Sequence, residues 1–366
     1  MKELDKRDIM KSIMKIFVVA AVVALGVISG GCKGSTDDFD EIVLVADRNT
    51  IAADGRDVVN VKAMCGAKDV TAEVEWLYNV ERDRVFHVGE GRFTTTKAGI
   101  FKVSATNGGV SSNECEVTAT EPEKPHVSQF VRHICVMDFT ATDCAFCPAG
   151  QNQMIAVNGQ MEDEATKIHL MALHNPGVDP MGIKLVADMM SDFEISAQPY
   201  YLIDMRDKGG ISSNEEKSAY RKGLLNSMNN YPARVGVDVV TDWDSSTREC
   251  RIDVKLLSEC NDYWRVAVYV LEDGLSASQN VDGTYKDYIH NHVLRTMVSS
   301  SYRGDNVGGV AADTEVGKTY TLTVPEEWVA ENCSVCVLAI DMNGFSNNMG
   351  KCELIDDHFT YDYLEN

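Results

Sequence analysis

Residues 132–148 read RHICVMDFTATDCAFCP, and this stretch decides the fold class of the middle of the chain. Its first nine residues are mostly apolar and predict a short buried strand. The strand leads into a Cys-x-x-Cys pair formed by Cys144 and Cys147. Because Pro148 is tolerated only in a first helical turn, we expect a helix that begins near Cys144, with Cys147 one turn in and more sheltered.

Strand-like and helix-like stretches continue to alternate beyond the pair. The sequence predicts a helix to about 161, a strand at 167–173, a helix at 181–193, a strand at 198–204 and a helix at 214–228. Strands that alternate with helices are typical of an α/β unit, and we place this unit at residues 127–232.

The Cys-x-x-Cys pair has a specific use at a strand-to-helix junction. The helix N-terminus carries unpaired N–H groups and a partial positive charge, which stabilise a thiolate on Cys144, and Cys147 can reach back to close a disulfide. The alternatives are a redox-inert structural disulfide and half of a zinc site. The zinc site is disfavoured because Cys333 and Cys336 lie in an apparent strand, where such positions face opposite ways. We therefore expect neither a metal nor a cofactor.

The residues around the pair resemble the thioredoxin family. Asp138 and Phe139 match its strand acid and aromatic, and the first cysteine follows six residues after the acid. The resemblance implies that Cys144 is the attacking thiol, that Cys147 is the resolving thiol and that Asp138 is the buried acid that helps to deprotonate it. It also implies that Pro199 is a cis-proline facing the disulfide, with Gln198 beside it.

The match to the thioredoxin pattern has two departures. Asp143 precedes the first cysteine where thioredoxins usually carry Trp, and a carboxylate there opposes the effect of the helix dipole on the thiol. The segment between Cys147 and Pro199 is also longer than the usual one.

The N-terminus predicts the compartment. A basic start is followed by an apolar run at 16–28, about 13 residues, which is too short to span a bilayer but suits a signal peptide. Small residues then precede Cys32 and resemble a bacterial lipobox, so we expect a signal peptide at 1–31 and a lipidated Cys32. The alternative is an ordinary secretory signal with an incidental cysteine.

Residues 32–40 form an acidic tether after the lipidation site. A lysine followed by acids resembles the export signal of surface lipoproteins in Bacteroidetes. We therefore expect a lipid-anchored protein of the outer membrane, at the cell surface, although a plain solvated tether has the same composition.

Residues 41–120 alternate apolar and polar side chains between turn residues, which predicts a β-sandwich. The order of these signals resembles bacterial immunoglobulin-like domains, which are usually spacers or adhesion modules. Cys65 and Cys115 either bridge this domain or stay as buried thiols. Residues 121–126, EPEKPH, predict a hinge.

Residues 233–360 again alternate in the strand manner and predict a C-terminal β-sandwich. His290 and His292 are two residues apart, so in a strand they share a face. A His-x-His pair can bind metal, but no third ligand is identifiable, and polar surface or loop anchoring is the favoured interpretation. His174 is interpreted as a packing or surface histidine, with a role at the site as the alternative because it ends a predicted strand on the side where active sites form.

The whole arrangement resembles the Omp28-like outer-membrane proteins of Bacteroidetes, in which a thioredoxin-like domain precedes a β domain. The resemblance covers about residues 126–360. It implies a thioredoxin-like α/β domain followed by a C-terminal β-sandwich, and together with the immunoglobulin-like β-sandwich expected at 41–120 this predicts a multidomain chain.

The composition limits the partners. The 366 residues include 56 acids and 34 bases, a net charge of −22, and such a surface repels nucleic acid. Two functions remain: thiol–disulfide exchange on envelope proteins through Cys144 and Cys147, or a non-catalytic lipoprotein that binds surface ligands on the same scaffold.

Overall fold

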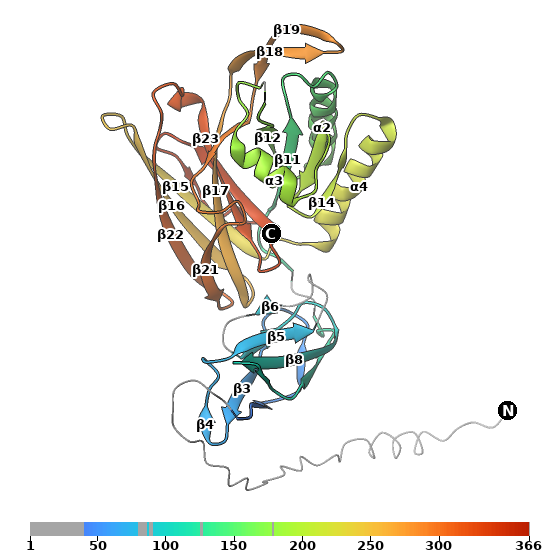
Figure 1. Ribbon diagram of the computed structural model, residues 1–366, viewed down its shortest axis with the longest axis vertical. Coiled ribbons are helices and arrows are strands. Elements are labelled where there is room, and N and C mark those ends of the chain that lie inside the picture. Colours follow the sequence, from blue (N-terminus) through green and yellow to red (C-terminus); the bar gives the residue numbers. More distant parts are fainter. Residues whose placement is uncertain (1–39, 80–85, 88–90, 125–126, 178, 366) are drawn as a thin grey trace, which may run out of the picture.

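The computed structural model describes residues 40–79, 86–87, 91–124, 127–177 and 179–365. The expected signal peptide, Cys32 and all but the last residue of the tether lie outside this part of the chain. None of the helices in the described ranges has the length and apolarity that a membrane crossing requires. A smaller β unit, drawn in blue and teal, lies at one end of a larger body that begins near residue 127 (Figure 1).

The smaller unit is a sandwich of two facing sheets. One sheet contains β1 (Val43–Ala46), β3 (Val59–Cys65), β4 (Lys68–Asp69), β6 (Phe86–His87) and β7 (Arg92–Thr94). The other contains β2 (Thr50–Ala52), β5 (Glu75–Asn79), β8 (Gly99–Asn107), β9 (Val110–Ser111) and β10 (Cys115–Thr120). Alternate residues of β3 and β8 point inward and form the shared core, as the sequence pattern predicted. Cys65 and Cys115 are both in the thiol form.

The described residues in the middle of the chain form four neighbouring strands and three helices. The strands are β11 (Arg132–Thr140), β12 (Thr166–His174), β13 (Tyr200–Ile203) and β14 (Asp207–Gly210), and the helices are α2 (Cys147–Met161), α3 (Lys184–Asp192) and α4 (Asn214–Asn230). The spatial order is β14-β13-β11-β12, with β12 parallel and β13 antiparallel to β11. All but β14 lie within three residues of the expected bounds.

Both faces of β11 are buried, because alternate residues serve two cores. Ile134 and Val136 pack with side chains of α2 and α4. Met137 and Phe139 pack on the other face with side chains of α3. The continuous apolar run in the sequence reflects this double burial.

The sheet continues beyond β12 into the last third of the chain. Among the described residues it has nine strands, and the additional ones are β17 (Asp262–Glu272), β20 (Val293–Met297), β21 (Asp305–Val310), β23 (Cys333–Ile340) and β24 (Ser346–Glu353). The link is parallel pairing of Ala172 with Val293. Segments 127–232 and 233–360 therefore share one sheet.

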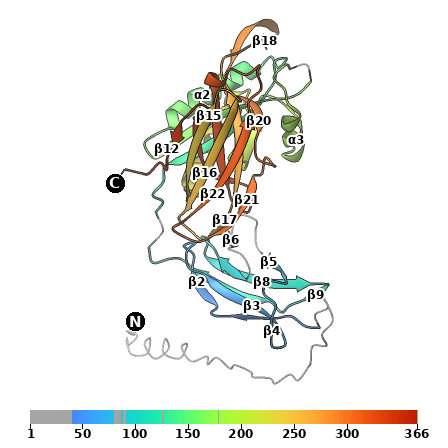
Figure 2. The same ribbon diagram turned by 90° about the vertical axis from the view of Figure 1, so that its left-hand side faces the viewer.

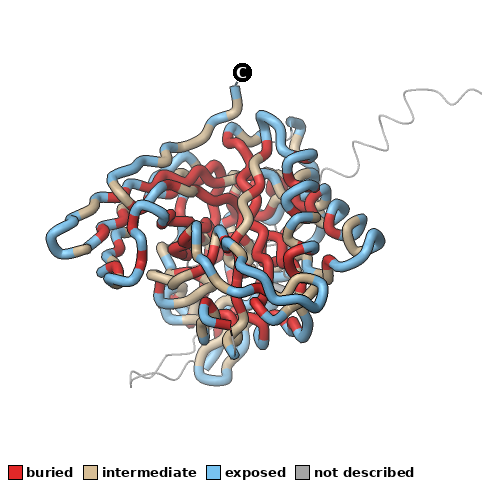
Figure 3. Tube along the Cα trace, turned by 90° about the horizontal axis from the view of Figure 1, so that it is seen from above, coloured by how far each residue is buried: buried red, intermediate tan, exposed pale blue. Residues whose placement is uncertain are grey.

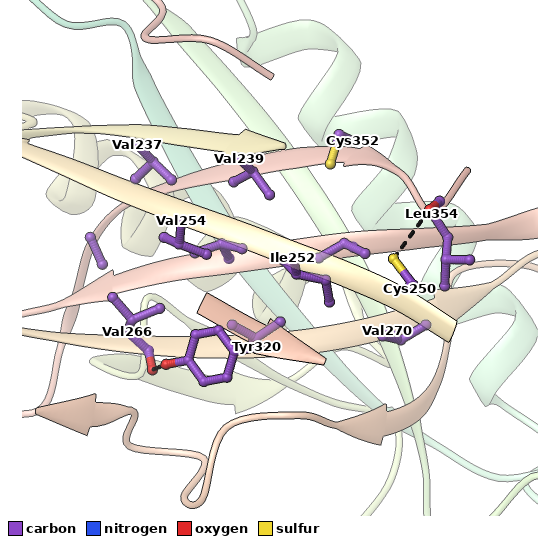
Figure 4. Packing of buried hydrophobic residues seen from close by; sticks show 14 of the residues in the cluster. Val237, Val239, Cys250, Ile252, Val254, Val266, Val270, Tyr320, Cys352 and Leu354 are labelled. Carbon is purple, nitrogen blue, oxygen red and sulfur yellow. Dashed lines mark hydrogen bonds between the residues drawn. The ribbon is translucent and has the colours of Figure 1, made fainter. Parts of the chain in front are cut away.

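A second sheet covers part of this long sheet and completes a β-sandwich. Its strands are β15 (Val235–Asp244), β16 (Glu249–Ser258), β22 (Thr314–Thr323) and β25 (His358–Phe359), and a short 3₁₀ helix, η1 (Ala330–Asn332), precedes β23. Valines of β15 and β17 meet between the two sheets (Figure 4). Figure 3 shows the buried positions gathered in the centre of the body. Two polar groups inside this core are satisfied by backbone carbonyls: Tyr320 Oη donates to Val266 O and Cys250 Sγ donates to Leu354 O.

The smaller sandwich contacts the body at the turn between β16 and β17, below β17 in both views (Figures 1 and 2). The main-chain N–H of Asn261 donates to Gly55 O at 2.8 Å, and its side chain donates to Arg56 O at 2.7 Å. Gly55 has a φ of +73°, and a Cβ there would lie 3.0 Å from Cys260 Cβ. Glycine therefore permits this close approach.

Candidate functional site

The site begins where β11 ends and α2 starts. The expected helix start near Cys144 is wrong, because α2 begins at Cys147 and Phe146 precedes it as the N-cap. Pro148 therefore lies in the first turn, where its missing N–H costs no hydrogen bond and its fixed φ suits the helix. Residues 141–146 form a loop that carries Cys144 in front of the helix end.

Cys144 and Cys147 form the disulfide of the site, with an S–S distance of 2.04 Å. Cys144 is partly exposed, whereas Cys147 is only 1% exposed. An incoming sulfur can therefore reach the first cysteine and not the second. Phe146, between them, is 61% exposed and presents a large apolar side chain beside the disulfide.

Asp138 lies beneath α2 and is completely buried. Gln151, one helical turn beyond Cys147, donates from Nε2 to Asp138 Oδ2 at 3.2 Å, and within the described residues Asp138 Oδ1 has no partner. Burial raises the pKa of Asp138 to about 7, and the hydrogen bond from Gln151 opposes this only in part. The carboxyl can thus exchange a proton near neutral pH.

Pro199 follows a cis peptide bond with Gln198 and packs against the first turn of α2. A Cβ at Gly150 would lie 2.9 Å from the Pro199 ring, so glycine is required where helix and proline meet. A groove of about 420 Å³ runs past the disulfide, and its lining includes Cys144, Phe146 and Gln198. The structure therefore brings Cys144 and the residue before Pro199 to one open surface.

A hairpin from the last third of the chain is docked on the disulfide loop. It consists of β18 (Leu275–Val281) and β19 (Thr284–His290) and arches over the top of the molecule in Figure 1. Asn280 N–H donates to Thr142 O at 2.8 Å, and Gln279 Nε2 donates to Cys144 O at 3.1 Å. The loop position therefore depends on residues about 135 positions away in sequence.

Sequence reasoning missed this hairpin, although a local signal for it exists. Asp282 and Gly283 both have positive φ, 50° and 84°, and join the two strands as a two-residue turn. An Asp-Gly pair between alternating strands is a strong hairpin signal. Its docking on the disulfide loop has no such signal.

His174 ends β12 and belongs to the site. Its Nδ1 is 2.7 Å from Asp179 Oδ2, and both side chains are buried. The same Asp179 oxygen accepts the Thr142 N–H at 2.8 Å. Asp179 therefore holds both the His174 ring and the disulfide loop, an arrangement that the sequence did not reveal.

His290 and His292 do not lie in one strand, so the condition for a shared face is not met. His290 ends β19 and is buried edge-on against His174, whereas His292 has a φ of 59° in the following turn and lies 3.1 Å from Asp273. The left-handed residue turns the two rings toward different neighbours. The described ranges contain no cluster of three groups that could hold a metal ion.

Residues 186–350 match the model of a protein family described as outer membrane protein Omp28. The match begins in α3 and ends in β24, so all of it follows the disulfide cysteines in the sequence. It confirms the prediction of an outer-membrane location. No curated protein matches the chain.

Two solved structures from Porphyromonas gingivalis resemble the chain. HBP35 aligns over 62% of this chain and 77% of its own, with 18% identity and a TM-score of 0.52. A domain of the outer membrane lipoprotein Omp28 aligns over 34% of this chain and 92% of its own, with 22% identity and a TM-score of 0.24. At such identity the likeness to HBP35 concerns the fold alone.

Proposed function

We propose that this protein is a lipid-anchored, surface-exposed outer-membrane protein that exchanges disulfides with envelope proteins through Cys144 and Cys147. Residues 127–232 act as a thioredoxin-like unit in this proposal. The strand order, the helix that starts at the second cysteine and the cis bond at Pro199 all support the assignment. The observation that carries it is the disulfide, with one accessible and one sheltered sulfur, in the wall of a groove that also includes Gln198.

The chemistry is a pair of exchange steps. In the dithiol form, the Cys144 thiolate attacks a substrate disulfide, forms a mixed disulfide and releases one substrate thiolate. The Cys147 thiolate then attacks Cys144 Sγ, closes the protein disulfide and releases the second substrate thiolate. The substrate gains two electrons and the protein loses two.

Other residues around the disulfide assist the exchange. Pro199 aligns the substrate chain along the groove. Asp138, with a pKa of about 7, helps to take up the proton of the Cys147 thiol.

The Cys144→Ser variant tests the mechanism. Insulin reduction, with dithiothreitol as the electron donor, should be lost in this variant and retained in Cys115→Ser, which removes a half-buried thiol in the smaller sandwich. Activity that survives Cys144→Ser contradicts the mechanism.

The reduction potential of the pair separates an exchange site from a structural disulfide. Thiol trapping across glutathione buffers, read by mass spectrometry, should give a value between roughly −120 and −270 mV, as for catalytic thiol proteins. A value well below about −300 mV rejects turnover.

The second candidate function is a non-catalytic lipoprotein that binds a surface ligand. Exposed apolar side chains on the smaller sandwich favour it, with Val45 53% and Ile100 66% exposed. We assign residues 41–120 to an immunoglobulin-like module in either case, as a spacer or binding unit. A reduction potential well below about −300 mV, together with the absence of insulin reduction, selects this second function.

A further inference from the structure

A small cavity lies against the sheltered sulfur of the disulfide. Its volume is about 10 Å³, and its lining includes Cys147, Gln151, His174 and His290. Most of the lining side chains carry hydrogen-bonding groups, and the volume is close to the minimum for one water molecule. The cavity therefore suits one bridging water better than an apolar or larger ligand.

The His174 ring is held in one orientation beside this cavity. Burial opposes ionisation of Asp179, but the hydrogen bonds from His174 and from the backbone N–H groups of Thr142 and Met181 help to keep the pKa of Asp179 below its usual value, so the carboxyl is ionised at neutral pH. An ionised carboxylate only accepts hydrogen bonds, so Nδ1 of His174 must carry the proton that faces it at 2.7 Å. The lone pair of a neutral His174 is then on Nε2, where a proton acceptor needs it.

His290 closes the same cavity from the docked hairpin. Its ring centroid is 5.2 Å from that of His174, and its Nε2 is buried with no partner among the described residues. Burial, and then the neighbouring His174, lower the pKa of His290 to about 4. His290 is thus neutral at pH 7. Of the two neighbouring rings, His174 is therefore the one that can take up a proton.

We infer that the His174–Asp179 pair takes the proton of the Cys147 thiol, through one water in this cavity, when Cys147 resolves the mixed disulfide. The inference rests on the proposed exchange function and adds to it a second proton acceptor. Asp138 does not line the cavity but accepts a hydrogen bond from Gln151, which does, whereas His174 lines the cavity directly.

The proposed step balances in atoms and charge. The S–H bond of Cys147 breaks, its proton passes through the water to His174 Nε2, and an imidazolium forms beside the Asp179 carboxylate. The electron pair left on Cys147 Sγ attacks Cys144 Sγ, and the substrate sulfur leaves as a thiolate. His174 then returns the proton to that thiolate or to solvent.

Among the described residues, five groups that can titrate lie on or around this proton path, and they come from several elements. They are Asp179 after β12, His290 and Tyr288 on β19, Cys147 at the start of α2, and Asp138 on β11 behind Gln151. The step therefore predicts that a Cys147 thiolate and a His174 imidazolium form together. Loss of His174 should affect this ionisation more than loss of a charge on the protein surface.

The test measures the titration of Cys147 by itself. Thiolate ultraviolet absorbance is recorded against pH for the full chain carrying Cys144→Ser, and the Cys144→Ser/Cys147→Ser double variant is subtracted. Adding His174→Asn keeps an amide donor for Asp179 and removes the Nε2 acceptor. His292→Asn is the matched control, because His292 does not line this cavity and asparagine tolerates its positive φ.

We expect His174→Asn to raise the pKa of the Cys147 thiol by about one to three pH units, the effect of losing an adjacent opposite charge. The His292→Asn control should leave the titration unchanged. An unchanged Cys147 titration in a folded His174→Asn protein overturns the inference.

An NMR titration of the His174 ring provides a second readout if His174→Asn fails to fold. In the Cys144→Ser protein the ring should gain its proton as Cys147 loses its own, and this coupling should vanish when Cys147 is also replaced. A ring titration that ignores Cys147 overturns the inference as well. Both readouts are independent of turnover. A reduction potential well below about −300 mV would reject the proposed exchange function, but it would not decide whether His174 takes the proton of Cys147.

Discussion

The Asp138→Asn substitution exchanges a completely buried carboxyl for a neutral amide of almost the same shape. The amide oxygen can still accept the hydrogen bond from Gln151. What changes is the ability to carry a negative charge in a site where burial disfavours it. The stability of the two proteins should therefore differ in its dependence on pH.

The magnitude follows from the pKa of Asp138, which burial raises from 3.8 to about 7 in the folded state. The folded state holds the proton more tightly, so the carboxyl contributes stability that is fully present below pH 3.8 and is lost as the pH rises through about 7. The raised pKa corresponds to about 4 kcal/mol, which Asp138→Asn should recover at alkaline pH.

The assay is urea unfolding of the oxidised full chain at a series of pH values, followed by fluorescence and circular dichroism. Between the two pKa values, the free energy of unfolding of the wild type should fall relative to the variant by about 1.4 kcal/mol per pH unit. Asp287→Asn, at an exposed position on β19, is the matched control and should show no such trend.

A stability difference that stays constant from acidic to alkaline pH refutes this reasoning. So does an NMR titration in which the Asp138 carboxyl ionises near its ordinary value of 3.8. Either result means that the carboxyl is solvated or paired in a way that the structure does not contain.

Three further predictions concern the neighbours of the disulfide and the membrane anchor. Gly150→Ala places a Cβ 2.9 Å from the Pro199 ring and should cost about 1–3 kcal/mol of stability, measured by urea unfolding; an unchanged midpoint contradicts the close packing. Gln279→Ala removes hydrogen bonds to the carbonyls of the disulfide loop and should speed amide exchange in the β18–β19 hairpin, with unchanged exchange the contrary result. Cys32→Ser should move the protein from the membrane fraction to the soluble fraction; retention in the membrane excludes the lipid anchor.

Local patterns predicted the strands and helices around the site with good accuracy. The strand expected at 132–140 is β11 to the residue, because a β-prone apolar run buried on both faces has little freedom to slip. The helix start was misplaced by three residues, because tolerance of Pro148 in a first turn does not specify which residue opens that turn.

The histidines show what local sequence patterns cannot predict. His290 and His292 share a face only if both lie in one strand, but β19 ends at His290 and His292 itself has a left-handed backbone. His174 has no local signature of its role, because Asp179 and His290 reach it from a loop and from a distant hairpin. Sequence spacing carries no information about such encounters.

The sequence by itself determined the covalent and local features: the Cys144–Cys147 spacing, the proline that can adopt the cis form, and the alternation of strands and helices at 127–232. Only the tertiary structure decided that the sheet continues into the last third of the chain, that a hairpin from there holds the disulfide loop, and that His174 and Cys147 share a cavity. The physical reason is the separation along the sequence over which each kind of interaction acts. Propensity and turn chemistry act over a few residues, whereas these arrangements arise from burial and hydrogen bonding between segments that lie from a few tens to more than a hundred residues apart.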